Sequence, residues 1–96
     1  MRRRKHVTVR IADLEALWHQ QDGKCYYCGG PMNFTGGKRT ARTVSVDRID
    51  SSAGYDLDNI VLACTACNIG KGEMTTQEFI AHCAAVVEHQ NKEPVA

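Results

Sequence analysis

Four of the five cysteines form two pairs with the same spacing. Two residues separate Cys25 from Cys28, and two separate Cys64 from Cys67. Two such pairs in a short chain are the ligand set of a tetrahedral structural zinc site, whose four thiolates leave no open position for a substrate. A redox-active dithiol is the alternative chemistry for paired cysteines. We therefore predict a zinc ion that holds the fold together, so that removing it unfolds the chain.

Asp47 and Asn68 could form a second, harder metal site. Asp47 ends a short alternating segment, and Asn68 directly follows the last paired cysteine. One carboxylate and one amide oxygen are sparse, hard ligands that suit Mg²⁺ or Mn²⁺. Asp47 alone would be an ordinary carboxylate at a strand end. Its combination with Asn68 and the cysteine frame favours a role as a metal ligand.

Short elements must position these residues. Apolar residues at helical spacing predict a helix over 11–21, with Ile11, Leu14, Leu17 and Trp18 facing inward. Residues 44–47 and 60–63 are predicted to be partner strands around a turn at 51–54, and a short helix is expected from 65 to about 71. The predicted fold class is therefore α+β.

The last predicted helix carries the odd cysteine. Thr75 and Glu78 have the spacing of a capping box that opens this helix. One of its sides is apolar and includes Phe79, Ile80, Cys83, Val86 and Val87. We expect Cys83 to be a buried core thiol rather than a ligand or a nucleophile.

The composition fits one small domain. With 96 residues and 6% aromatics, the core alone stabilises the chain only marginally, so we expect a structural metal ion to add stability. The sequence contains no secretory signal and no apolar stretch of the roughly 18 to 20 residues that a membrane span needs. We expect no membrane association and a cytoplasmic location, in a bacterial or phage-infected cell, where thiols stay reduced.

Basic residues are clustered although the net charge is only +1. Such clusters suit phosphate contacts, whereas a solvated tail is the alternative for the arginine run. Lys71, near the end of a helix, could touch phosphate or could be a surface lysine that complements the helix dipole. The candidate nucleic-acid contacts are Arg2, Arg3, Arg4, Lys38, Arg39, Arg42 and Lys71.

Three ordered motifs give the chain a family resemblance. They are Val-Asp-Arg-Ile-Asp at 46–50, Gly-Tyr followed by Asn59 and an apolar run at 54–62, and Cys64-x-x-Cys67-Asn68-x-x-Lys71. Together they resemble the HNH (His-Asn-His) nucleases, over residues 11–75. The resemblance implies a ββα-metal, treble-clef-like finger with a four-cysteine zinc site and flanking N- and C-terminal helices. It also implies that Asp47 and Asn68 hold the catalytic metal, and that Asn59 braces the connecting loop.

The resemblance further implies a DNA endonuclease that hydrolyses phosphodiester bonds, with structural Zn²⁺, catalytic Mg²⁺ or Mn²⁺, and DNA as partner. The expected organisation is a basic arm at 1–10, a nuclease domain at 11–90 and a disordered tail at 91–96, acting as a monomer or homodimer. Arg48 departs from the family pattern, in which a histidine at this position takes a proton from water.

An arginine stays charged and cannot be that base, so Arg48 is expected to clamp the scissile phosphate. His6 and Tyr27 are the favoured bases among His6, His19, Tyr27, Asp50 and Tyr55. A catalytically inactive zinc module that binds nucleic acid or protein is the alternative function, and Arg48 would then mark a lost base.

Overall fold

The protein is a small mixed α+β structure with a two-stranded sheet and three helices in its described parts. A computed structural model describes residues 9–34 and 37–92, so most of the predicted basic arm and tail lies outside the described residues. The elements in chain order are α1 (Ile11–Gln20), β1 (Val44–Arg48), the 3₁₀ turn η1 (Leu57–Asn59), β2 (Ile60–Cys64), α2 (Thr65–Lys71) and α3 (Thr76–Gln90). These bounds agree with the elements that the sequence predicts, to within one or two residues.

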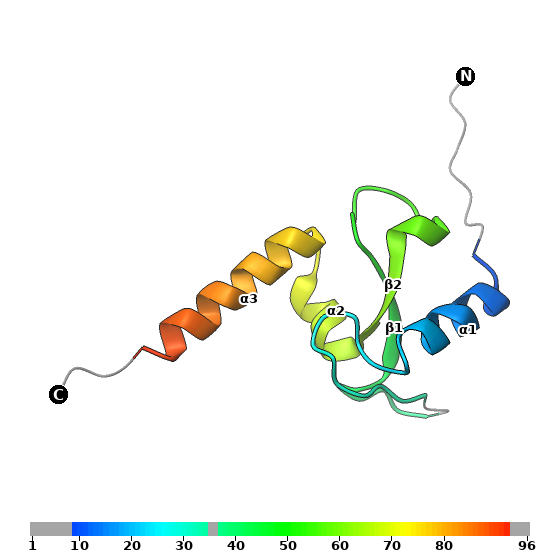
Figure 1. Ribbon diagram of the computed structural model, residues 1–96, viewed down its shortest axis with the longest axis horizontal. Coiled ribbons are helices and arrows are strands. Elements are labelled where there is room, and N and C mark those ends of the chain that lie inside the picture. The colour runs from blue at the N-terminus through cyan, green and yellow to red at the C-terminus, as the bar shows by residue number, and fades with distance from the viewer. Residues whose placement is uncertain (1–8, 35–36, 93–96) are drawn as a thin grey trace, which may run out of the picture.

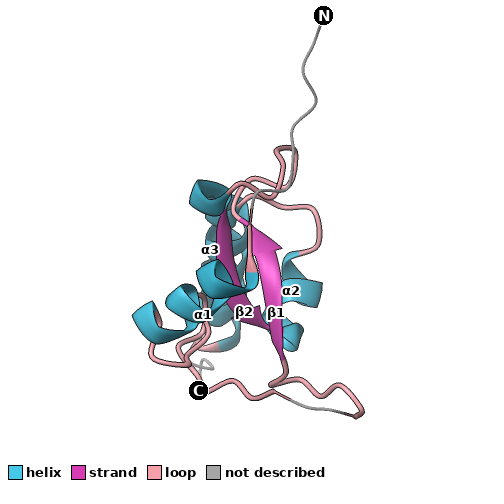
Figure 2. Ribbon diagram, turned by 90° about the vertical axis from the view of Figure 1, so that its right-hand side faces the viewer, coloured by secondary structure: helices cyan, strands magenta, loops and turns pink. Residues whose placement is uncertain are grey.

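The β1–β2 hairpin is the centre of the fold. Its antiparallel register pairs Val44 with Cys64 and Arg48 with Ile60. All five residues of β2 are buried, because α1 lies on one side of the hairpin and α2 on the other, as Figures 1 and 2 show. The two faces of β1 therefore meet different helices, and neighbouring side chains along it enter different environments.

Helix α1 packs on the hairpin through one face only. Asp13 accepts a hydrogen bond from the Arg10 backbone N–H at 2.9 Å, which satisfies a donor at the start of the helix. Leu14, Leu17 and Trp18 pack against the core cluster of Cys25, Met32, Leu62, Ala63 and Cys64. The expectation that Ile11 also faces inward is wrong, since it is 76% exposed at the first turn.

Helix α3 extends away from the rest of the molecule (Figure 1). Its capping box is present as predicted: the Glu78 N–H donates to Thr75 Oγ1 at 3.1 Å, and the Thr75 N–H donates to Glu78 Oε1 at 2.9 Å. Only Thr76 and Phe79 are buried, and the apolar residues after them are exposed. The prediction of a buried Cys83 is therefore wrong, because no other described element covers this part of α3.

None of the helices in the described parts of the chain is long and apolar enough to cross a membrane.

Candidate metal centre and the neighbouring polar cluster

The two cysteine pairs converge on one point. The sulfur atoms of Cys25, Cys28, Cys64 and Cys67 all lie within 4.8 Å of one another. A tetrahedral zinc ion with Zn–S bonds of about 2.3 Å requires sulfurs about 3.8 Å apart. The Cys28 and Cys64 sulfurs are 4.0 Å apart. The four thiols can therefore hold a structural metal such as zinc, as the spacing predicts.

The backbone around the cysteines is arranged to hold thiolates. The turn after Cys25 places the N–H of Tyr27 3.4 Å from the Cys25 sulfur, and the N–H of Cys64 donates to the same sulfur at 3.3 Å. The Gly30 N–H donates to the Cys28 sulfur at 3.5 Å, and this hydrogen bond is the main cause that lowers the pKa of Cys28 to about 6. Burial has the opposite effect on Cys67 and raises the pKa of its thiol, so a metal must displace that proton.

Arg42 is part of the metal centre. Its guanidinium donates to the sulfurs of Cys28 and Cys64, each at 3.5 Å, while its Nε donates to the Pro31 carbonyl at 2.9 Å. Four thiolates carry more negative charge than one Zn²⁺ neutralises, and a guanidinium held at this distance offsets part of the excess. The predicted nucleic-acid contact of Arg42 is untested, and in the structure its donors bond the cysteine sulfurs and the Pro31 carbonyl.

Replacing Arg42 by glutamine is expected to speed zinc release by about tenfold, because groups that hydrogen-bond metal ligands tune the affinity of the metal. The rate can be followed with a chromogenic zinc chelator in excess. Arg39→Gln is the matched control, since Arg39 is an exposed arginine of the same loop. Equal release rates in the two variants would show that Arg42 does not support the metal.

Asp47 lies in a second polar cluster, on the side of β1 that faces α2. The residue is 4% exposed, and its carboxylate accepts a hydrogen bond from the Tyr27 hydroxyl at 2.5 Å. The Lys71 ammonium lies 3.4 Å from the same oxygen and donates to the Arg48 carbonyl at 2.8 Å. The Tyr27 hydroxyl also lies 3.0 Å from Thr76 Oγ1. The cluster thus joins the cysteine turn, β1, α2 and the start of α3.

Tyr27 is held in this cluster as a hydrogen-bond donor. Burial, followed by the hydrogen bond to Asp47, raises the pKa of its phenol above the ordinary value. The ring packs edge-on against Phe79, with the ring centroids 5.3 Å apart, which fixes the direction of the hydroxyl. Although Tyr27 lies beside Asp47, a phenol that keeps its proton is poorly suited to the role of general base.

Asn68 faces the same surface of β1 as Asp47. Its Nδ2 donates to Ser45 Oγ at 3.0 Å, and Ser45 precedes Asp47 by two residues, so both side chains project from one face of the strand. Lys71, one helical turn after Asn68, reaches Asp47. The two predicted metal ligands therefore come from facing elements, and each is bonded to a different partner.

The chemistry of these donors fits a hard cation. The Lys71 ammonium is itself a cation, and its partners are the Asp47 carboxylate and the Arg48 carbonyl oxygen. Oxygen donors of this kind are the ligands that Mg²⁺ and Mn²⁺ prefer. The position is suited to a divalent ion only when the ammonium has moved away.

Lys71 and Arg48 do not lie where the sequence predicts. The Lys71 side chain is 0% exposed, so neither a DNA contact nor a role as a surface lysine fits it. The Arg48 guanidinium lies 4.8 Å from the centre of the Tyr55 ring and donates to the Ala53 carbonyl at 3.0 Å. Its interactions are with the hairpin loop, whereas those of Asp47 are with Tyr27 and Lys71. The structure therefore does not bring Arg48 to Asp47 as a phosphate clamp.

Asn59 braces the hairpin loop from its far end. Its Oδ1 accepts from the Asp50 N–H at 3.0 Å, and its Nδ2 donates to the Asp50 and Gly54 carbonyls at 3.1 and 2.7 Å. These are contacts of the kind that the resemblance implies for this residue. They fix the chain directly after β1, where Ile49 and Asp50 lie.

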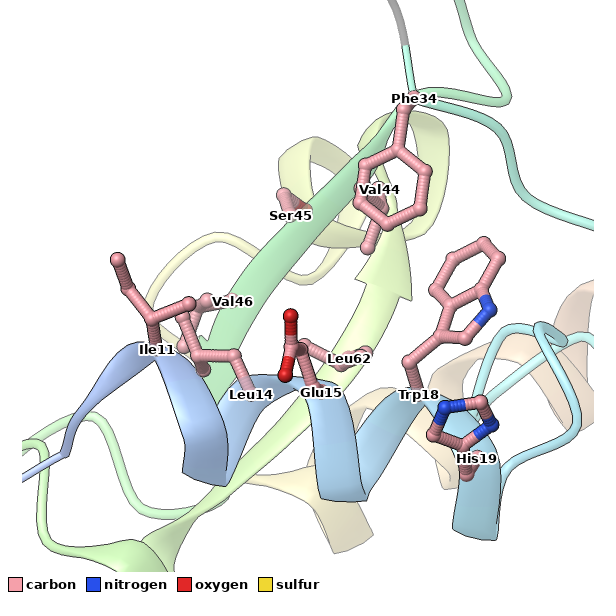
Figure 3. A pocket seen from close by; sticks show the side chains of 10 residues that line it. All are labelled: Ile11, Leu14, Glu15, Trp18, His19, Phe34, Val44, Ser45, Val46 and Leu62. Carbon is pink, nitrogen blue, oxygen red and sulfur yellow. The ribbon is translucent and has the colours of Figure 1, made fainter.

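The other candidates do not join the Asp47 cluster in the described part of the chain. His6 and Arg2, Arg3 and Arg4 lie outside the described residues, while Lys38 and Arg39 are exposed in the loop before β1. His19 lines a groove of about 610 Å³ between α1 and β1, with Trp18, Phe34 and Val46 among its walls (Figure 3). This groove is mainly apolar and opens on the α1 side of the hairpin, opposite the side on which Asp47 meets α2. His19 therefore does not join the Asp47 cluster.

Comparison with known proteins identifies a viral relative. No family model matches the chain, and no solved structure matches it. Over 68 residues the chain is 34% identical to "Uncharacterized protein R423" of Acanthamoeba polyphaga mimivirus. The match covers 71% of this chain but only 12% of the viral protein. The site itself must therefore carry any argument about activity.

Proposed function

We propose that the chain is a metal-dependent DNA endonuclease of the HNH type, with a ββα-metal finger formed by β1, β2 and α2. The observation that carries the proposal is the placement of Asp47 and Asn68 on facing surfaces of β1 and α2, beside a cysteine cluster that can hold zinc. Asp47 and Asn68 would hold Mg²⁺ or Mn²⁺. When bound, such an ion stabilises the charge that develops on the phosphate and on the leaving 3′ oxygen.

The surrounding residues have supporting roles in this proposal. The Tyr27 hydroxyl fixes one oxygen of Asp47, and Ser45 fixes the amide of Asn68, so both ligands are oriented before a substrate arrives. Asn59 holds the loop after β1 in place. His6 is the proposed base that accepts a proton from water as water adds to phosphorus and the bond to the 3′ oxygen breaks. The exposed Lys38 and Arg39, with the arginines of the basic arm, would contact DNA phosphates.

The test is nicking of supercoiled plasmid by the zinc-loaded protein. We expect nicking with added Mg²⁺ or Mn²⁺ and none when both are omitted. Asn68→Ala should lower the rate by about 100-fold, the upper end of what loss of a group beside a metal costs. Ser45→Ala is the matched control, because it breaks the same hydrogen bond without removing a proposed ligand. Equal losses in the two variants, or nicking without added metal, would contradict the proposal.

A zinc module without catalytic activity is the second candidate. The burial of Asp47 and its pairing with Lys71 favour it, because the carboxylate is already neutralised by a side chain of the protein. This candidate predicts that the folded, zinc-loaded protein binds DNA or a protein but does not nick DNA with either ion. The plasmid test therefore separates the two functions.

A further inference from the structure

Lys71 is unusual for a lysine because its charge is inside the protein. Its side chain is 0% exposed although the glycines on both sides of it, Gly70 and Gly72, are exposed. A lysine at the end of a surface helix ordinarily buries its aliphatic stem and keeps its ammonium in water. Here the ammonium instead turns inward to the Arg48 carbonyl and the Asp47 carboxylate.

The backbone at the end of α2 supports this inward direction. Gly72 has φ +55°, a left-handed conformation that glycine adopts without strain, and its N–H donates to the Asn68 carbonyl at 3.2 Å. The helix therefore ends directly after Lys71, and the chain turns toward the start of α3. The Thr76 N–H then donates to the Ile49 carbonyl at 3.1 Å, which holds this segment against the end of β1. Lys71 is enclosed between these contacts.

We infer that Lys71 is the resident cation of the Asp47 site, and that a divalent ion binds there only when the Lys71 ammonium is displaced. The inference rests on the proposed function for the identity of the competing ion. With the ammonium 3.4 Å from Asp47, a divalent ion on the same carboxylate would lie a few ångströms from a positive charge, and their repulsion is poorly screened inside the protein. The ammonium would thus keep the carboxylate neutralised, and would set how much metal the site needs.

The test replaces the ammonium by an uncharged side chain of similar shape. Lys71→Met leaves the buried Asp47 carboxylate without a counter-ion, so its thermal stability should depend on a divalent ion that can take the vacant position. We expect saturating Mn²⁺ to raise the melting temperature of zinc-loaded Lys71→Met by about 5 °C or more. The wild-type protein should shift by much less. Mn²⁺ is the probe because it prefers oxygen to thiolate ligands, and zinc content is measured in every sample.

The matched control is the double variant Asp47→Asn with Lys71→Met, which removes both charges. It should fold and should not respond to Mn²⁺. An equal shift in the single and double variants would overturn the inference, and so would the absence of a shift in Lys71→Met. If Lys71→Met folds only with Mn²⁺, the inference is supported; if it fails to fold with Mn²⁺ while the double variant folds, the inference is wrong. If neither of the other variants folds, the same Mn²⁺ shift is measured in Lys71→Gln, which keeps an N–H donor for the Arg48 carbonyl. A shift there supports the inference, and its absence overturns the inference.

The Mn²⁺ stability test and the plasmid-nicking test can give different answers, so the resident cation and the nuclease are tested separately. A Mn²⁺ response in Lys71→Met, together with no nicking by any form of the protein, would support the resident cation and reject the nuclease. Nicking that depends on Asn68, together with no Mn²⁺ response in Lys71→Met, would support the nuclease and reject the resident cation.

Discussion

Replacing Cys64 by serine is expected to leave the chain unfolded at room temperature. Cys64 is 0% exposed, it is a member of the four-thiol cluster, and it is both the last residue of β2 and the N-cap of α2. Structural zinc sites contribute about 10 to 16 kcal/mol in small domains, which equals or exceeds the whole stability of an ordinary domain, about 5 to 15 kcal/mol. Circular dichroism and zinc analysis of the purified variant would measure both losses.

Cys83→Ser is the matched control for this experiment. Cys83 is exposed on α3 and lies outside the four-thiol cluster, so its replacement should change neither zinc content nor the unfolding midpoint. A zinc chelator should reproduce the Cys64→Ser result on the wild-type protein. A native-like spectrum for Cys64→Ser, or for the chelated protein, would mean that the cysteine cluster is not what holds the fold together.

Replacing Asp47 by alanine is expected to lower the free energy of unfolding by about 3 to 5 kcal/mol. The loss has little to do with the attraction between Asp47 and Lys71 itself. It arises because the variant leaves the buried Lys71 ammonium without a counter-ion and the Tyr27 hydroxyl without its closest acceptor. Urea denaturation of zinc-loaded protein measures it, with the slope of the transition checked against the wild type.

Asp58→Ala is the control for this prediction, because Asp58 is an exposed carboxylate in η1 and should be replaceable within about 0.5 kcal/mol. Similar losses at the two positions would show that the Asp47–Lys71 pair is not a buried pair in solution. The prediction also bears on nuclease assays. An inactive Asp47→Ala protein could simply be unfolded, which is why Asn68 and Ser45 provide the sharper comparison.

The local signals in the sequence predict most of the fold. The paired cysteines, the alternating segments at β1 and β2, and the Thr75–Glu78 capping box each depend on a few neighbouring residues, and each is present. The predictions for Ile11 and Cys83 are wrong for one physical reason. Helical periodicity identifies which residues share a face, but it does not reveal whether another element covers that face. Both residues are exposed in the structure: Ile11 lies at the edge of the groove between α1 and β1, and Cys83 lies on the part of α3 that extends from the hairpin.

The candidate site is harder to predict, because the charge of a residue does not reveal the direction in which its side chain points. The charge pattern favours Lys71 and Arg42 as phosphate contacts. In the structure Lys71 points into the polar cluster around Asp47, and Arg42 donates to the cysteine sulfurs. Both destinations depend on residues that are distant in sequence. The alternation along β1 indicates that Asp47 and Arg48 point to different sides. The signal for Lys71 is weaker, and consists of its place between two glycines at the end of a short helix.

Helix α2 has only seven residues, fewer than the roughly 12 to 15 that an isolated helix needs to persist in water. It is fastened at its first turn by the thiols of Cys64 and Cys67 and at its last residue by Lys71. Asn68 lies between these two attachments. Under the proposed function, a cell short of zinc would therefore lose the orientation of Asn68 as well, and the supply of one metal would govern whether the protein can use another.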